Sequence, residues 1–126
     1  MEKEEFEGLK IGDHVWKFEI DFSTTGKIIM NLIAELEVIK KEYQSQQYIG
    51  FNIVKVECGT SLREGMKINY GSNQYYHVSR LFKNYNEGVD YWNSAIRNEE
   101  DRITSVYQDR VKKLQRKLKK KRSCCG

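Results

Sequence analysis

Apolar and polar residues alternate along much of the first two-thirds of the chain, and this period of two predicts β-strands. The clearest stretch runs from residue 15 to residue 22, directly after the turn residues Gly12 and Asp13. We expect its apolar side chains to point into a core. These inward positions are Val15, Phe18, Ile20 and Phe22.

Residues 28–43 are ambiguous, because their apolar positions fit both a helix and a strand. Ile28, Leu32 and Leu36 recur at helical spacing. β-Branched residues nevertheless dominate the segment, and Gly26 precedes it, which favours one or two strands.

Three further segments complete the predicted sheet. Residues 48–59 alternate again and end at Gly59. Residues 66–71 and 75–82 are expected to pair as a hairpin around the turn sequence Gly-Ser-Asn-Gln. About five antiparallel strands would then precede residue 83, enough for a small sheet or open barrel of SH3-like or OB-like size.

The last third of the chain changes to helical spacing. From about residue 87 to 120, apolar side chains recur in steps of three, four and seven, interrupted only at Glu99–Glu100. Asn84 or Asn86 is the expected helix cap, and Glu87 favours the positive end of the helix. The stripe consists of Val89, Trp92, Ile96, Ile103, Tyr107, Val111, Leu114 and Leu118.

These elements predict an α+β fold, with a small antiparallel sheet or open barrel of about five strands followed by C-terminal helices. We expect a single domain over residues 1–126. Its β-rich part would span about 10–83, its helical part about 86–120, and a flexible basic, cysteine-containing tail 121–126. A helix this long extends beyond such a sheet, so its far end has nothing in the same chain to pack against. We therefore expect a homodimer or higher oligomer through the C-terminal helices.

Charge divides the chain into an acidic body and a basic tail. The formal net charge is +4. Nine bases and no acid lie between Arg110 and Arg122, and subtracting these from the 22 Lys and Arg leaves 13 against 18 Asp and Glu, a net charge of −5. The high isoelectric point therefore describes the tail rather than a cationic domain.

The basic tail has three interpretations that the sequence leaves open. Its charge would attract the phosphates of a nucleic acid. A polybasic run beside Cys124 and Cys125 also fits a lipid anchor, although a prenylation motif would need its cysteine fourth from the end. The third interpretation is a solvated helix end, where bases stabilise the negative pole of the helix.

The sequence shows no sign of membrane insertion or secretion. No apolar run approaches the roughly 18 residues of a membrane span, and the first eight residues are acidic and polar, unlike a signal peptide. Three cysteines, two of them adjacent, make a poor disulfide framework. We therefore expect a cytoplasmic protein, in a bacterial host cytosol if the chain is phage-encoded.

Candidates for catalysis are few. His14 and His77 are the two histidines, and no Cys or Asp is spaced as in a catalytic triad or a metal site. The segment 57–65 lacks the Gly-Lys-Ser/Thr ending of a phosphate loop. We therefore expect no enzyme, no cofactor and no metal, and we look for binding instead.

Residues 81–110 gather aromatic, amide and arginine side chains, which is typical of a nucleotide site. A base stacks on an aromatic ring for about 1–3 kcal/mol, and arginine binds phosphate oxygens with its planar fork. Packing is the alternative explanation, above all for Trp92 and Tyr107, which fit the apolar stripe. The candidate binding residues are Phe82, Tyr85, Asn93, Arg102, Asp109 and Arg110.

The order of elements and the aromatic-plus-arginine set from Phe82 to Arg110 resemble the phage Thoeris anti-defence proteins that sequester cyclic ADP-ribose-type signals. The resemblance implies a non-catalytic oligomer that holds a cyclic nucleotide between protomers, near the starts of the helices. It would make Phe82 the stacking residue and Asn93 a polar contact, with Asp109 and Arg110 on ribose and phosphate.

The same resemblance implies a second basic site on the sheet side, for which Lys27 and Arg63 are the candidates. Two other functions stay open. One is a small nucleic-acid-binding module that uses the basic C-terminal helix. The other is a protein whose helix serves oligomerisation or interaction alone.

Overall fold

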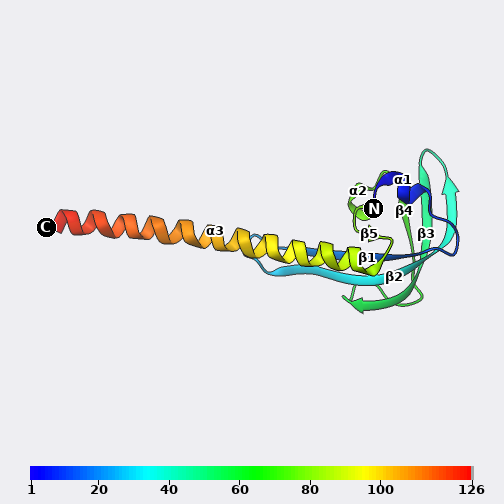
Figure 1. Cartoon of the computed structure of the whole chain (residues 1–126), viewed down its shortest axis with the longest axis horizontal. Coiled ribbons are helices and arrows are strands. Elements are labelled where there is room, and N and C mark those ends of the chain that lie inside the picture. Colours follow the sequence, from blue (N-terminus) through cyan, green and yellow to red (C-terminus); the bar gives the residue numbers. More distant parts are fainter. Residues whose placement is uncertain (126) are drawn as a thin grey trace.

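The computed structural model describes residues 1–125, with side chains described as far as Leu118. An open five-stranded antiparallel sheet is followed by one long C-terminal helix, which confirms the predicted α+β fold (Figure 1). The elements are α1 (Lys3–Glu7), β1 (His14–Phe22), β2 (Ile28–Tyr43), β3 (Gln47–Cys58), β4 (Lys67–Gly71), α2 (Tyr75–Val78), β5 (Leu81–Phe82) and α3 (Tyr85–Cys125).

The sheet has the strand order β4-β3-β2-β1-β5. Its central strand β2 is the segment that the sequence left ambiguous, and the preference for a strand is confirmed. β2 pairs along its length with β1 on one side and β3 on the other. Alternate residues of β2 are buried, as the period of two requires: Leu32, Ala34, Leu36 and Val38.

The predicted hairpin between 66–71 and 75–82 is wrong. Tyr75–Val78 form the short helix α2, and the two-residue strand β5 pairs with β1 instead of β4. This helical turn carries the chain from β4 at one edge of the sheet to β5, which forms the other edge beside β1. Val78 and Leu81 are buried by this crossing, which a hairpin would leave on an outer edge.

Both faces of the sheet are covered, so the predicted inward residues of β1 divide between two layers. Val15 belongs to the main core, where α1 also places Phe6 against Phe51. Phe18 and Ile20 are buried on the opposite face, where Phe18 packs edge-on against Trp92 of α3. Neither α1 nor the division of the apolar residues of β1 between two faces was predicted from the sequence.

The helix α3 begins on the sheet and then leaves it. The Asn84 side chain accepts a hydrogen bond of 2.9 Å from the Glu87 backbone N–H and so caps the helix, one of the two caps predicted. Gly88 sits directly against the Phe18 ring, where a Cβ would overlap with it. Beyond the β1–β2 turn α3 projects away from the body as a single straight helix rather than a helix pair (Figure 1).

The helix α3 extends farther than the sequence predicted. α3 continues to Cys125, five residues past the predicted helical part. The side chains of the predicted flexible tail 121–126, including both tail cysteines, lie outside the described residues. Of the helices in the described part, none is long and apolar enough to cross a membrane.

Candidate functional site

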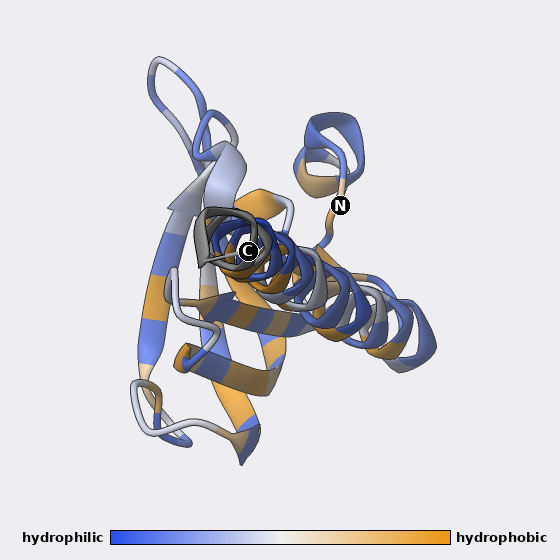
Figure 2. Cartoon of the chain, turned by 90° about the vertical axis from the view of Figure 1, so that its left-hand side faces the viewer, coloured by the Kyte–Doolittle hydropathy of each residue, from blue (hydrophilic) through white to orange (hydrophobic). Residues whose placement is uncertain are grey.

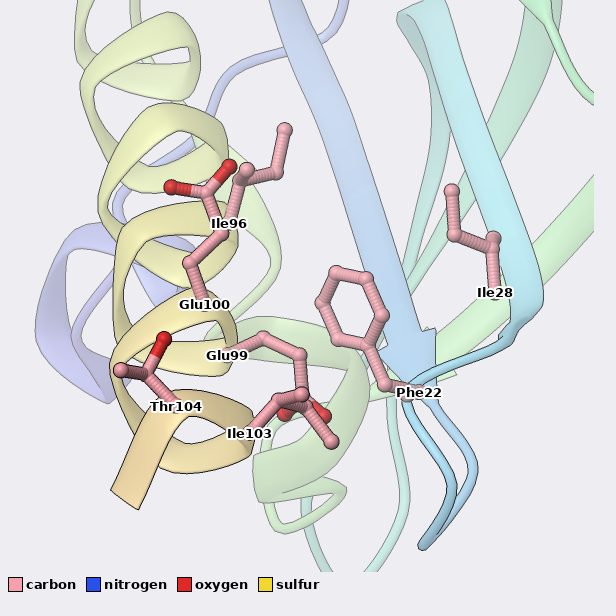
Figure 3. A pocket seen from close by; sticks show the side chains of 8 residues that line it. Phe22, Ile28, Ile96, Glu99, Glu100, Ile103 and Thr104 are labelled. Atoms are coloured by element: carbon pink, nitrogen blue, oxygen red, sulfur yellow. The ribbon is translucent and has the colours of Figure 1, made fainter. Parts of the chain in front are cut away.

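A groove lies between α3 and the β1–β2 turn (Figure 3). It has a volume of about 400 Å³. Phe22 and Ile28 come from the sheet and face Ile96 and Ile103 of the helix across it. We call it the turn groove; its lining is Phe22, Gly26, Ile28, Ile96, Glu99, Glu100, Ile103 and Thr104.

Arg102 fixes the β1–β2 turn to the helix beside this groove. Its Nη2 donates to the Thr24 carbonyl at 3.0 Å and to the Ser23 carbonyl at 3.4 Å, and it lies 2.5 Å from Glu99 Oε1. The hydrogen bond from Arg102 lowers the pKa of Glu99, so the carboxylate stays charged. The guanidinium predicted to bind phosphate is thus occupied with backbone and carboxylate oxygens.

A smaller hollow lies farther along the helix, on the other side of the same turn. It has a volume of about 210 Å³ and combines an aromatic ring, an arginine and two threonine hydroxyls. Tyr107 is 67% exposed there, so its ring is open to a ligand. We call it the Arg110 hollow; its lining is Thr24, Thr25, Ile103, Val106, Tyr107 and Arg110.

Phe82 and Tyr85 belong to the packing between α3 and the sheet. Phe82 lies edge-on to Phe18 at 5.9 Å between ring centroids and 5.4 Å from Tyr91. Tyr85 is partly exposed, packs edge-on against Trp16 at 5.0 Å, and donates a hydrogen bond of 2.9 Å to a Glu57 carboxylate oxygen. Both rings therefore have protein partners on at least one side.

One chain does not bring the six predicted residues into a single pocket. Asn93 and Asp109 are exposed on α3. From Tyr85 to Arg110 the helix rises by about 37 Å, at roughly 1.5 Å per residue, far more than the span of one nucleotide. Arg110 alone of the six lines a described hollow.

Lys27 and Arg63, the predicted second basic site, are both exposed, and they lie on different loops. Lys27 ends the β1–β2 turn, where its backbone N–H donates to the Ser23 hydroxyl at 3.1 Å. Arg63 lies in the β3–β4 loop, where its backbone N–H points to the sulfur of Met66 at 3.2 Å. Neither side chain has an ion-pair partner among the described residues.

A buried polar cluster between β1, β4 and α2 was not predicted from the sequence. Lys17 is 2% exposed, lies 2.8 Å from Glu19 Oε1 and 3.5 Å from His77 Nδ1, and donates to the Tyr70 hydroxyl. The His77 ring stacks on Tyr70 at 4.5 Å. We call these four residues the Lys17 cluster.

Burial sets the ionisation of the Lys17 cluster. Desolvation lowers the pKa of Lys17, which the neighbouring carboxylate partly opposes, and it raises the pKa of Tyr70. Burial and the Lys17 charge lower the pKa of His77. Glu19 Oε1 contacts the ammonium, but no described donor is aligned to hydrogen-bond with it. The cluster joins β4 and α2 to β1 and so ties together the two edges of the open sheet.

A sequence signal for this cluster exists. Strand periodicity places Lys17 and Glu19 on the same side as Val15, which is a core residue. Opposite charges two residues apart on an inward face are therefore expected to pair. The partners Tyr70 and His77 come from distant parts of the chain, and no local pattern identifies them.

Comparisons with known proteins give no relative for this arrangement. No family model matches the chain, and the searches of curated proteins and of solved structures returned no significant match. Within the described residues, no group of three or more His, Cys, Asp or Glu side chains is placed to hold a metal ion. The features that bear on function are therefore the grooves, the Lys17 cluster and the projecting helix.

Proposed function

We propose that the protein is a self-associating binding module, in which the small sheet anchors α3 and the projecting part of α3 pairs with another copy. One observation carries this proposal. Tyr107, Leu114 and Leu118 are 67%, 64% and 52% exposed on a helix that has already left the sheet. Apolar side chains recurring along one side of a projecting helix mark an interaction surface. Figure 2 shows hydrophobic segments recurring along the otherwise mostly hydrophilic ribbon of this helix.

The test compares a face variant with a matched control on the same helix. Leu114→Gln/Leu118→Gln removes the apolar stripe, whereas Asn98→Gln/Ser105→Gln changes two exposed residues on the opposite side. Burying a leucine contributes about 1.5 kcal/mol or more to association. Losing two leucines per copy should therefore raise the dissociation constant at least about a hundredfold. Sedimentation equilibrium measures it, and a wild-type protein that stays monomeric at all accessible concentrations refutes the proposal.

We propose nucleotide capture as a second function, supported by the composition of the Arg110 hollow. Tyr107 offers a face for a base, Arg110 offers donors for phosphate, and Thr24 and Thr25 offer hydroxyls. This proposal keeps the cyclic ADP-ribose-type ligand suggested by the sequence but moves the site away from Phe82 and Asn93. Binding without turnover needs only stacking and neutralised phosphates.

Calorimetry with a panel of cyclic nucleotides and ADP-ribose isomers tests this second function. Arg110→Ala should abolish the binding heat, whereas Arg116→Ala removes the same charge from the same helix away from the hollow and should preserve it. Equal losses in both variants would indicate unspecific attraction of phosphates to the basic helix. Recovery of the intact ligand after heat release distinguishes capture from catalysis.

A further inference from the structure

We propose that two copies pair antiparallel along α3, so that the end of each helix fills the turn groove of the other copy. This inference rests on the proposed self-association. It adds the orientation, the register and the surface that receives the exposed leucines.

The turn groove and the exposed part of α3 form one continuous surface. At about 3.6 residues per turn, the three helix residues Ile96, Glu100 and Ile103 lie within about 40° of the line through Tyr107. Leu114 and Leu118 lie on the same line farther along the helix. A partner helix that covers the leucines of one copy is therefore directed along the groove as well.

A twofold axis near Tyr107 brings matching residues together and covers the Tyr107 ring, so this pairing excludes a nucleotide from the Arg110 hollow. In an isologous pair, a residue seven positions after Tyr107 meets the residue seven positions before it. Leu114 then meets Glu100 of the other copy, and Leu118 meets Ile96. Leu118 would thus enter the apolar end of the groove, where Phe22 and Ile28 form the opposite wall.

Charge selects the antiparallel orientation. The groove presents Glu99 and Glu100, while the helix end carries nine bases and no acid between residues 110 and 122. Antiparallel pairing places Lys113 and Lys117 of one copy on the same flank as Glu99 of the other. Parallel pairing in register would place the nine bases of one copy beside the same nine of its neighbour, and like charges on adjacent helices repel.

A helix cannot fill its own turn groove. Leu118 lies 15 residues beyond Ile103, about 22 Å farther along the axis. Residues 89–125 contain neither glycine nor proline, so the sequence offers no kink that would fold the end back. The acidic, apolar groove and the basic, apolar end therefore complement each other only between two copies.

Disulfide cross-linking tests the orientation. In a background with Cys58, Cys124 and Cys125 changed to Ser, a tagged Glu100→Cys chain is mixed with an untagged Leu114→Cys chain and mildly oxidised. Antiparallel pairing should give the 100–114 heterodimer, because bridged cysteines need Cα atoms within about 7 Å. The matched control, Asn98→Cys with Leu114→Cys, has its first cysteine on the opposite side of the helix and should give no such product.

The outcomes separate the pairing orientation from self-association itself. If sedimentation shows a dimer but Leu114→Cys chains cross-link only with themselves, antiparallel pairing is refuted and self-association stands. A dimer that forms neither product also refutes the register. A chain that never dimerises refutes both. Salt gives an independent readout: antiparallel pairing should weaken as ionic strength rises, whereas parallel pairing should strengthen.

Discussion

Lys17→Met tests the buried polar cluster, because it removes the ammonium group that joins β1 to β4 and α2. Lys17 is 2% exposed and contacts Glu19, Tyr70 and His77. Methionine has a similar unbranched length and fills the space without charge. The variant therefore leaves the packing largely intact and exposes the electrostatic contribution.

The expected cost follows from what the substitution leaves behind. The Glu19 side chain is 5% exposed, and its carboxylate would lose its ion-pair partner Lys17. Removing one partner of a buried ion pair costs about 3–5 kcal/mol, mostly because the remaining charge stays buried. A domain of ordinary stability has about 5–15 kcal/mol to lose, so the variant should be only marginally folded.

Replacing both charges provides the control. Lys17→Met/Glu19→Met removes the pair together and should recover most of the lost stability, since exchanging a whole buried pair for apolar residues is often neutral. Urea unfolding followed by circular dichroism measures the free energy of unfolding of all three proteins. A loss below about 1 kcal/mol in the single variant, or an equally unstable double variant, would refute the reasoning.

Three further predictions concern the same framework. The lowered pKa of His77 means that the folded chain resists its protonation, so stability should fall as the pH drops below about 6.5, and His77→Asn should flatten this fall. Gly88→Ala should destabilise the protein, because overpacking against Phe18 costs about 1–3 kcal/mol, whereas the gain in helix propensity contributes about 1 kcal/mol of stabilisation. Arg102→Ala should speed amide hydrogen exchange in the turn around Thr24, which loses its tie to α3.

Matched variants make these predictions decisive. Tyr75→Asn changes an exposed residue of the same short helix and should leave the acid-induced loss unchanged. Ser94→Ala gains helix propensity at an exposed position of α3 without meeting a ring, and a Gly88→Ala protein as stable as this control would contradict the close packing. Arg97→Ala removes an exposed arginine of the same helix, and turn exchange equally fast in both arginine variants would contradict the assigned role of Arg102.

Local patterns predicted the strands and the long helix, because the spacing of apolar residues in each element can be recognised within one continuous segment. The β-branched composition of residues 28–43 was sufficient to favour β2, and Asn84 was recognisable as a cap. α2 was misassigned because Tyr75–Leu81 contains β-formers, while its conformation depends on the Tyr70–His77 stacking and the burial of Val78. Such contacts depend on tertiary structure, and neither the strand spacing nor the helix spacing of apolar residues predicts them.

The candidate site shows a related limit of sequence reasoning. Residues 81–110 are close in sequence, which predicted a compact pocket for their aromatic and charged side chains. A straight helix separates them instead, so that Phe82 and Tyr85 pack on the sheet while Asp109 lies exposed beyond it. Composition identified side chains suited to binding, but the rise of the helix determines which of them can meet one ligand.

The fold of the body does not account for the apolar residues at the end of α3. Phe18 and Ile20 are already covered by the first turns of the helix, and the opposite face of the sheet has its own core around Leu36 and Phe51. Leu114 and Leu118 lie beyond the sheet, so polar residues there would cost the monomer nothing in packing. The proposed self-association would account for this apolar stripe, because a second copy would offer an apolar groove lined by Glu99 and Glu100.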